Sequence, residues 1–162
     1  MRIHRLSPAE LWKAVGVGVV TALLLSAVMV PALFLGISPL PKPVALAFAE
    51  TVLGRSLPLP VGLLFHVVYV AFWSLAYVAL FRDRLTFLNA LALGLVLWVV
   101  ALAVFFPIIG WGFLGLAVSP ALIGAALVPH LLFAVFLWGL CRWAFGPAPA
   151  PTPPRWPSAR RG

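Results

Sequence analysis

The chain has 162 residues and a composition that excludes most soluble folds, because 64% of its residues are hydrophobic and only 9% are charged. Ordinary globular domains contain about 25% charged residues, and so few charges cannot cover the surface of a soluble domain. The composition therefore indicates a membrane protein. One cysteine excludes an intramolecular disulfide, and the scarcity of cysteine and methionine is typical of a thermophilic source.

Four stretches are apolar and long enough to cross a bilayer, which takes about 20 residues. They cover about 14–36, 60–81, 85–109 and 120–145. We therefore expect an all-α, polytopic membrane domain of four transmembrane helices over residues 1–145. Residues 146–162 are rich in proline and arginine, so we expect them to form a disordered cytoplasmic tail.

The first helix is expected to begin before the membrane. Ser7 and Glu10 have the spacing of a capping box, and Pro8 occupies the first helical position between them. A helix that begins in the cytoplasm and continues into the bilayer is not expected to be cleaved as a signal peptide.

Basic residues are divided unequally between the two sides of the predicted spans. Of the eleven lysines and arginines, only Lys42 and Arg55 fall on one side. The positive-inside rule therefore predicts cytoplasmic N and C termini and a multi-pass protein of the inner (cytoplasmic) membrane. The charged residues 82–84 predict a tight turn that makes spans two and three antiparallel neighbours.

The two halves of the chain repeat a pattern. Gly18 stands 13 residues before Pro31, and Gly94 stands 13 residues before Pro107. These four residues are predicted to be structural, since proline frees a backbone carbonyl and glycine allows close helix packing. Because each half holds two spans, the halves are expected to be parallel hairpins related by a pseudo-two-fold axis along the membrane normal.

The second span of each half carries a histidine, and His66 and His130 are offset by 64 residues rather than by the 76 that separate the glycines. The difference of 12 predicts an insertion in the first half, residues 44–55. This segment is apolar, too short to span the bilayer, and expected to form a short helix at the outer interface. It is either a cover for the bundle or a gate over a cavity.

A candidate site is formed by these two histidines with Tyr69 and Trp73. Ionisable residues inside a membrane indicate function by default, and both histidines are expected at a similar depth in the outer half of the bilayer. Tyr69 and Trp73 share the helix face of His66, at spacings of 3 and 7 residues.

Three interpretations of this site stay open. In the first, which needs no cofactor, each histidine bonds a tyrosine or a carbonyl freed by proline and stabilises packing. In the second, His66 and His130 ligate haem b or a metal such as copper. In the third, His66 lines a quinone or small-molecule pocket together with Tyr69 and Trp73.

The remaining motifs predict no chemistry. Residues 110–115 match G-x-G-x-x-G but form a loop between membrane helices, so no nucleotide site is expected. The acidic residues Glu10, Glu50 and Asp83 lie at or beyond the membrane boundaries, where none can act as a buried general base. We therefore expect no enzyme activity and no nucleic-acid binding.

Small residues recur at every fourth position of the first span and predict close packing against another helix of the chain or against a partner subunit. They are Ala14, Gly18, Ala22 and Ser26.

The repeated pattern resembles a family of uncharacterised four-helix membrane proteins of bacteria and archaea, in which a helix with a Pro–Gly unit is followed by a helix with a histidine, twice over. The residues that carry the resemblance are Pro31, Gly36, His66, Pro107, Gly112 and His130. The resemblance implies the four-helix fold and no established activity.

The function favoured by these observations is a non-catalytic accessory subunit of a larger membrane complex, such as a respiratory oxidase or reductase. Its expected partners are the lipid bilayer and other subunits. The alternative is a haem-, metal- or quinone-binding membrane protein that uses His66 and His130. A small transporter or channel is a third hypothesis, which the lack of carboxylates inside the membrane disfavours.

Overall fold

In a computed structural model, the protein is described over residues 5–146 and is all-helical there. The α-helices are α1 (Pro8–Phe34), α2 (Val44–Leu53), α3 (Leu59–Phe81), α4 (Phe87–Val100), α5 (Phe106–Ile108) and α6 (Ala121–Phe145). A π-helical turn, Ala101–Phe105, joins α4 to α5, and a 3-10 turn, Phe113–Gly115, precedes α6. The predicted tail lies outside the described residues, apart from Gly146.

Four helical segments are long and apolar enough to cross a membrane, which confirms the predicted number of spans. They are α1, α3, the continuous segment Phe87–Ile108, and α6. The predicted insertion also forms its own short helix, α2. The expected all-α class is therefore correct, and the side of the membrane on which the ends lie stays a prediction.

The start of α1 has the predicted capping box. Ser7 Oγ accepts a hydrogen bond from the Glu10 backbone N–H at 3.3 Å, and Glu10 Oε2 accepts one from the Ser7 backbone N–H at 3.0 Å. These reciprocal bonds satisfy N–H groups that would otherwise lack a partner at the helix start. The helix then continues without interruption through Pro31.

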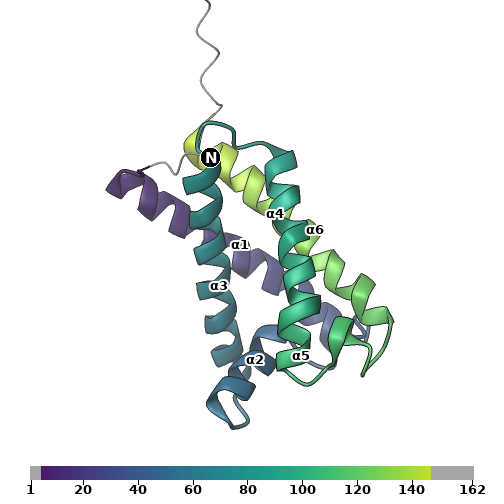
Figure 1. Cartoon of the computed structure of the whole chain (residues 1–162). Helices are drawn as coiled ribbons and strands as arrows, with labels where there is room; N and C mark the ends of the chain where they lie inside the picture. Colours follow the sequence, from purple (N-terminus) through teal and green to yellow (C-terminus); the bar gives the residue numbers. More distant parts are fainter. Residues whose placement is uncertain (1–4, 147–162) are drawn as a thin grey trace, which may run out of the picture.

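The helices pack as two pairs, α1 with α3 and α4 with α6, and α1 also lies along α6. In Figure 1, α3 and α4 stand in front of α1 and α6. A tight turn joins α3 to α4, in which Arg84 N–H donates to Phe81 O at 2.8 Å. The prediction that these two helices are close neighbours holds only near this turn, because their main packing partners are α1 and α6.

The side between α3 and α4 is filled by aromatic side chains and by α2. The ring of Phe48 in α2 lies 6.4 Å from that of Phe65 in α3 and 5.1 Å from that of Phe105 in the π-helical turn. Leu46 of α2 also packs closely on the backbone of α3 at Gly62. Helix α2 therefore covers one end of the bundle, on the side where α3 and α4 pack least closely on each other.

Glycine allows the closest helix contact within each pair. A Cβ added at Gly18 would lie 2.5 Å from Ala71 Cα, and one added at Gly94 would lie 2.7 Å from His130 O. Ala14 and Ala22, on the same face as Gly18, are fully buried. The predicted ridge of small residues therefore packs inside the chain, against α3.

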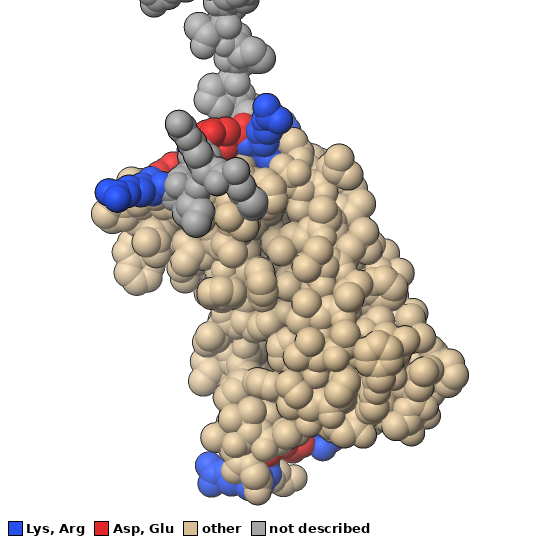
Figure 2. Space-filling view, in the orientation of Figure 1, with Lys and Arg blue, Asp and Glu red and all other residues tan. Residues whose placement is uncertain are grey.

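One end of the bundle, called here the basic end, brings together the start of α1, the α3–α4 turn and the end of α6. Arg82 Nε lies 2.7 Å from Glu10 Oε1, and the Arg82 guanidinium lies 5.0 Å from the ring centroid of Phe145. The opposite end, called the α2 end, carries Lys42 and Arg55. Figure 2 shows charged side chains at these two ends and an uncharged band between them on the face shown.

Candidate functional site

The two histidines come from different helices of the bundle. His66 lies on α3 and His130 on α6, and both are half-buried. Since α3 packs mainly on α1 and α6 mainly on α4, the two helices that carry the histidines are not packed closely on each other. That the two imidazoles face one another at a common depth stays a prediction.

His130 is fixed by a bond within its own helix. Its Nδ1 lies 2.6 Å from Ala126 O, and because a carbonyl only accepts, the neutral ring carries its proton on Nδ1 and has its lone pair on Nε2. Pro129 directly precedes it inside α6 and, lacking an N–H, interrupts the backbone hydrogen bonds beside this carbonyl.

This arrangement differs from the packing interpretation of the sequence. That interpretation paired each histidine with a tyrosine or with a carbonyl freed by Pro31 or Pro107, whereas the imidazole bond of His130 goes to Ala126. His66 makes no hydrogen bond to any residue that the structure describes. Its imidazole therefore keeps both nitrogens available for another partner.

Pro31 and Pro107 do not have equivalent surroundings. Pro31 lies within an unbroken α-helix, whereas Pro107 lies in α5, two residues after the π-helical turn, which ends with the Phe106 N–H donating to Ala101 O. Such turns occur often at functional positions, and this one presents Phe105 toward α3.

Tyr69 and Trp73 lie beside the histidines in an aromatic group. The ring of Tyr69 lies 6.2 Å from that of Trp73 and 5.6 Å from that of Phe105. Trp73 Nε1 is fully buried, and its N–H has no acceptor at hydrogen-bond geometry among the described residues. Phe105 was not among the predicted site residues, and its signal in the sequence is the pair of phenylalanines, Phe105 and Phe106, that precedes Pro107.

A second pair lies three helical turns nearer the basic end. Tyr77 on α3 and Cys141 on α6 are both fully buried in one apolar core cluster, and the Tyr77 hydroxyl donates to Thr86 O at 2.9 Å. These residues are offset by the same 64 positions as His66 and His130. Their equivalence under the predicted repeat stays a prediction.

The histidine pair lies where two apolar core clusters adjoin. The α2-end cluster contains Leu102, Phe106, Leu122 and Ala126, and the basic-end cluster contains Val70, Leu97, Phe133 and Leu137. On α6, His130 falls midway between the last residue of the first cluster and the first of the second. It therefore introduces a polar level into an otherwise apolar interior.

The polar groups of the candidate site are the two imidazoles, the Trp73 indole and the Tyr69 phenol. Within residues 5–146 no group of three or more His, Cys, Asp or Glu side chains is placed to hold a metal ion. A metal bound here would therefore have two imidazole ligands, with His130 Nε2 as one. A quinone carbonyl would find a donor in Trp73 Nε1.

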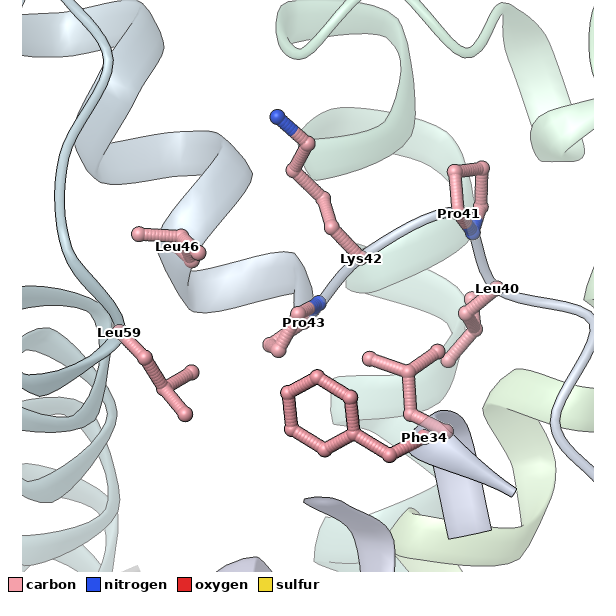
Figure 3. Close-up of a pocket in the computed structure, with 8 residues that line it drawn as sticks. Phe34, Leu40, Pro41, Lys42, Pro43, Leu46 and Leu59 are labelled. Carbon is pink, nitrogen blue, oxygen red and sulfur yellow. The ribbon is translucent and has the colours of Figure 1, made fainter. Parts of the chain in front are cut away.

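The two pockets described in the structure lie at the ends of the bundle rather than at the histidines. The pocket at the α2 end has a volume of about 390 Å³ and is lined mainly by apolar side chains. Figure 3 shows Phe34, Pro43 and Leu59 converging on it, whereas the Lys42 side chain extends away from Phe34. Its apolar lining suits a lipid chain better than a polar solute.

Glu50 links the residues that precede α2 to those that follow it. Its carboxylate lies 2.7 Å from Lys42 Nζ and accepts a hydrogen bond from the Leu57 N–H at 3.1 Å, so it joins the residues before and after the helix. The Lys42 ammonium and the Leu57 N–H hold the pKa of Glu50 below its ordinary value. This clasp favours the interpretation of α2 as a cover that packs on the bundle.

In comparisons with known proteins, no protein family, no curated protein and no solved structure matches the chain. The family resemblance therefore stays a prediction, and the function has to be argued from the residues alone.

Proposed function

We propose that the protein is a non-catalytic subunit of a larger membrane assembly. The observation that carries this proposal is the filling of the interior by the two apolar clusters, whose side chains include the fully buried Phe106, Leu122, Leu97 and Leu137. A packed interior with so few polar groups has little with which to replace the hydration of a solute. The packed interior therefore favours a structural subunit over a transporter.

The outward helix faces are then the parts of the bundle with which a partner can interact. Each spanning segment carries a valine that is about half exposed, and such positions contact either lipid or a neighbouring subunit. They are Val28 on α1 (45% exposed), Val68 on α3 (62%), Val96 on α4 (56%) and Val135 on α6 (47%).

Photo-crosslinking at these four valines tests the proposal. A benzophenone amino acid is placed at one position at a time in the full chain, expressed in its native membranes. The proposal predicts that at least one position gives a covalent adduct of defined, larger mass with another polypeptide, while positions on other faces give lipid adducts. Lipid adducts alone from all four positions would contradict it, as would solute flux through the purified protein in liposomes.

A second function is favoured by one observation at the histidine pair. Metal-ligating histidines commonly donate their other ring N–H to a carbonyl, which fixes the ring and makes it a better ligand, and His130 has this arrangement with Ala126. We propose as the alternative that His66 and His130 bind one soft metal ion such as Cu(I), or haem iron.

Purification in mild detergent separates the alternative from the first proposal. Metal analysis and an absorption spectrum are compared for the wild type, His66→Gln and His130→Gln. Copper at one equivalent, or a Soret band, that both variants lose establishes the cofactor site. A colourless, metal-free wild type that also fails to bind Cu(I) in competition with a chelator rules the alternative out.

A further inference from the structure

A second pocket, at the basic end, has a volume of about 280 Å³ and a lining of a different kind. It is formed by the α3–α4 turn, the start of α4 and the end of α6. Its lining residues include three arginines, one acid and two aromatic residues: Arg82, Arg84, Arg142, Asp83, Phe87 and Trp138.

The arginines of this pocket differ in how their charge is neutralised. Arg82 is paired with Glu10 at 2.7 Å. Arg84 and Arg142 have no carboxylate partner within residues 5–146, and the Arg142 guanidinium lies 5.8 Å from the ring centroid of Trp138. The lining therefore holds three guanidinium groups against the single carboxylate of Asp83, and a bound anion would balance the remaining positive charge.

The walls of the pocket continue into membrane-facing surface. Phe87 contacts Trp138 with ring centroids 5.6 Å apart and is 40% exposed, and the next residue, Leu88, is 71% exposed. Trp143, which follows Arg142, is 85% exposed. The site thus combines guanidinium groups with adjoining apolar surface at the end of the spans, where lipid headgroups meet acyl chains.

We propose that this pocket binds the phosphodiester headgroup of an anionic phospholipid, with Arg84 and Arg142 as its ligands. Guanidinium groups present several N–H donors in a planar arrangement that matches phosphate oxygens. The volume lies just below the usual range for small-molecule pockets, so it accommodates a headgroup while the acyl chains run along Phe87 and Leu88. Basic pockets at the ends of membrane helices are a known mode of lipid binding.

Native mass spectrometry of the full chain in detergent tests this site by titration with phosphatidylglycerol. Each arginine near a lipid surface contributes about fivefold in affinity, so Arg84→Gln with Arg142→Gln is expected to weaken binding by about 30-fold. The double lysine variant keeps both charges but loses the planar set of donors, so it is expected to recover only part of the affinity. Arg55→Gln, at the α2 end, is the matched control and should bind as the wild type does.

Two further probes identify the ligand. Phosphatidylcholine carries no net charge and inorganic phosphate carries no acyl chain, so the proposal predicts that neither competes with phosphatidylglycerol at equal concentration. Equal loss of binding in Arg55→Gln, or unchanged binding in the double glutamine variant, would overturn the site. Competition by inorganic phosphate would overturn the lipid as its ligand and assign the pocket to a free anion.

Discussion

A single methyl group at Gly18 is expected to separate α1 from α3. In Gly18→Ala the new Cβ would lie 2.5 Å from Ala71 Cα and 2.9 Å from Ser74 Cβ, well inside van der Waals contact. The nearer atom belongs to the backbone and cannot rotate away, so the helices have to shift. Overpacking of this kind costs about 1–3 kcal/mol. Because one of the clashing atoms is backbone, the cost of Gly18→Ala is expected near the upper end of this range.

Gly16 provides the control within the same helix. It has no atom outside its own helix within 4 Å of an added Cβ, so Gly16→Ala carries only the gain in helix propensity, about 1 kcal/mol. The same gain applies to Gly18→Ala and leaves a net destabilisation of about 2 kcal/mol. The two variants, two residues apart, are therefore expected to differ by about 3 kcal/mol with opposite signs.

Equilibrium unfolding in mixed micelles of increasing dodecyl sulfate content, followed by helicity, measures this difference. Both variants contain one methyl group more than the wild type, so changes in hydrophobicity cancel between them. If Gly18→Ala proves as stable as Gly16→Ala, the close approach of α1 to α3 does not exist as described, and the assignment of the small-residue ridge to an internal contact fails.

Three other changes test separate contacts. Ser74→Ala removes the 2.8 Å bond from its hydroxyl to a carbonyl of α1 and should cost about 0.6–1.7 kcal/mol in the same assay, whereas Ser26→Ala, which loses no bond among the described residues, should be near neutral. Tyr77→Phe removes one of the two donors to Thr86 O, which keeps the Ala90 N–H at 3.2 Å, and should cost about 1 kcal/mol, and an unchanged midpoint would contradict the bond. Because the pKa of Glu50 is lowered in the folded chain, its carboxylate stabilises the α2 segment at neutral pH and loses that effect as the pH falls below its ordinary value of 4.5. Amide exchange in α2 should therefore be faster in Glu50→Gln than in the wild type at pH 7, and this difference should shrink as the pH falls below 4.5, so a difference that does not shrink with pH would contradict the clasp.

The sequence contains enough information to predict the helices, because their signals are local. Capping at Ser7 depends on residues within one turn, and the length of each apolar run follows from the thickness of the bilayer. The short helix α2 was also predictable, because residues 44–55 form an apolar run that is too short to span the bilayer. Each of these features can be recognised without knowing which helices touch.

The packing of the helices could not be predicted in the same way. Every spanning helix is apolar on all faces, so hydrophobic periodicity does not indicate which face turns inward, and the loose contact between α3 and α4 follows from the sum of many side-chain fits. The bond from His130 to Ala126 depends on a side-chain rotamer, and the wider turn before Pro107 depends on how the chain accommodates a missing N–H. Both are set by tertiary structure.

Tyr77 on α3 and Cys141 on α6 are fully buried members of one core cluster, the first with a bulky phenol and the second with a small thiol. Two identical hairpins would have to place either two phenols or two thiols at these positions. A single chain with two unlike halves is free of that constraint, since each half can adjust its volume to the other. Exchanging the two residues, Tyr77→Cys with Cys141→Tyr, would conserve the total volume and yet move the hydroxyl off α3, from which it now donates to Thr86 O.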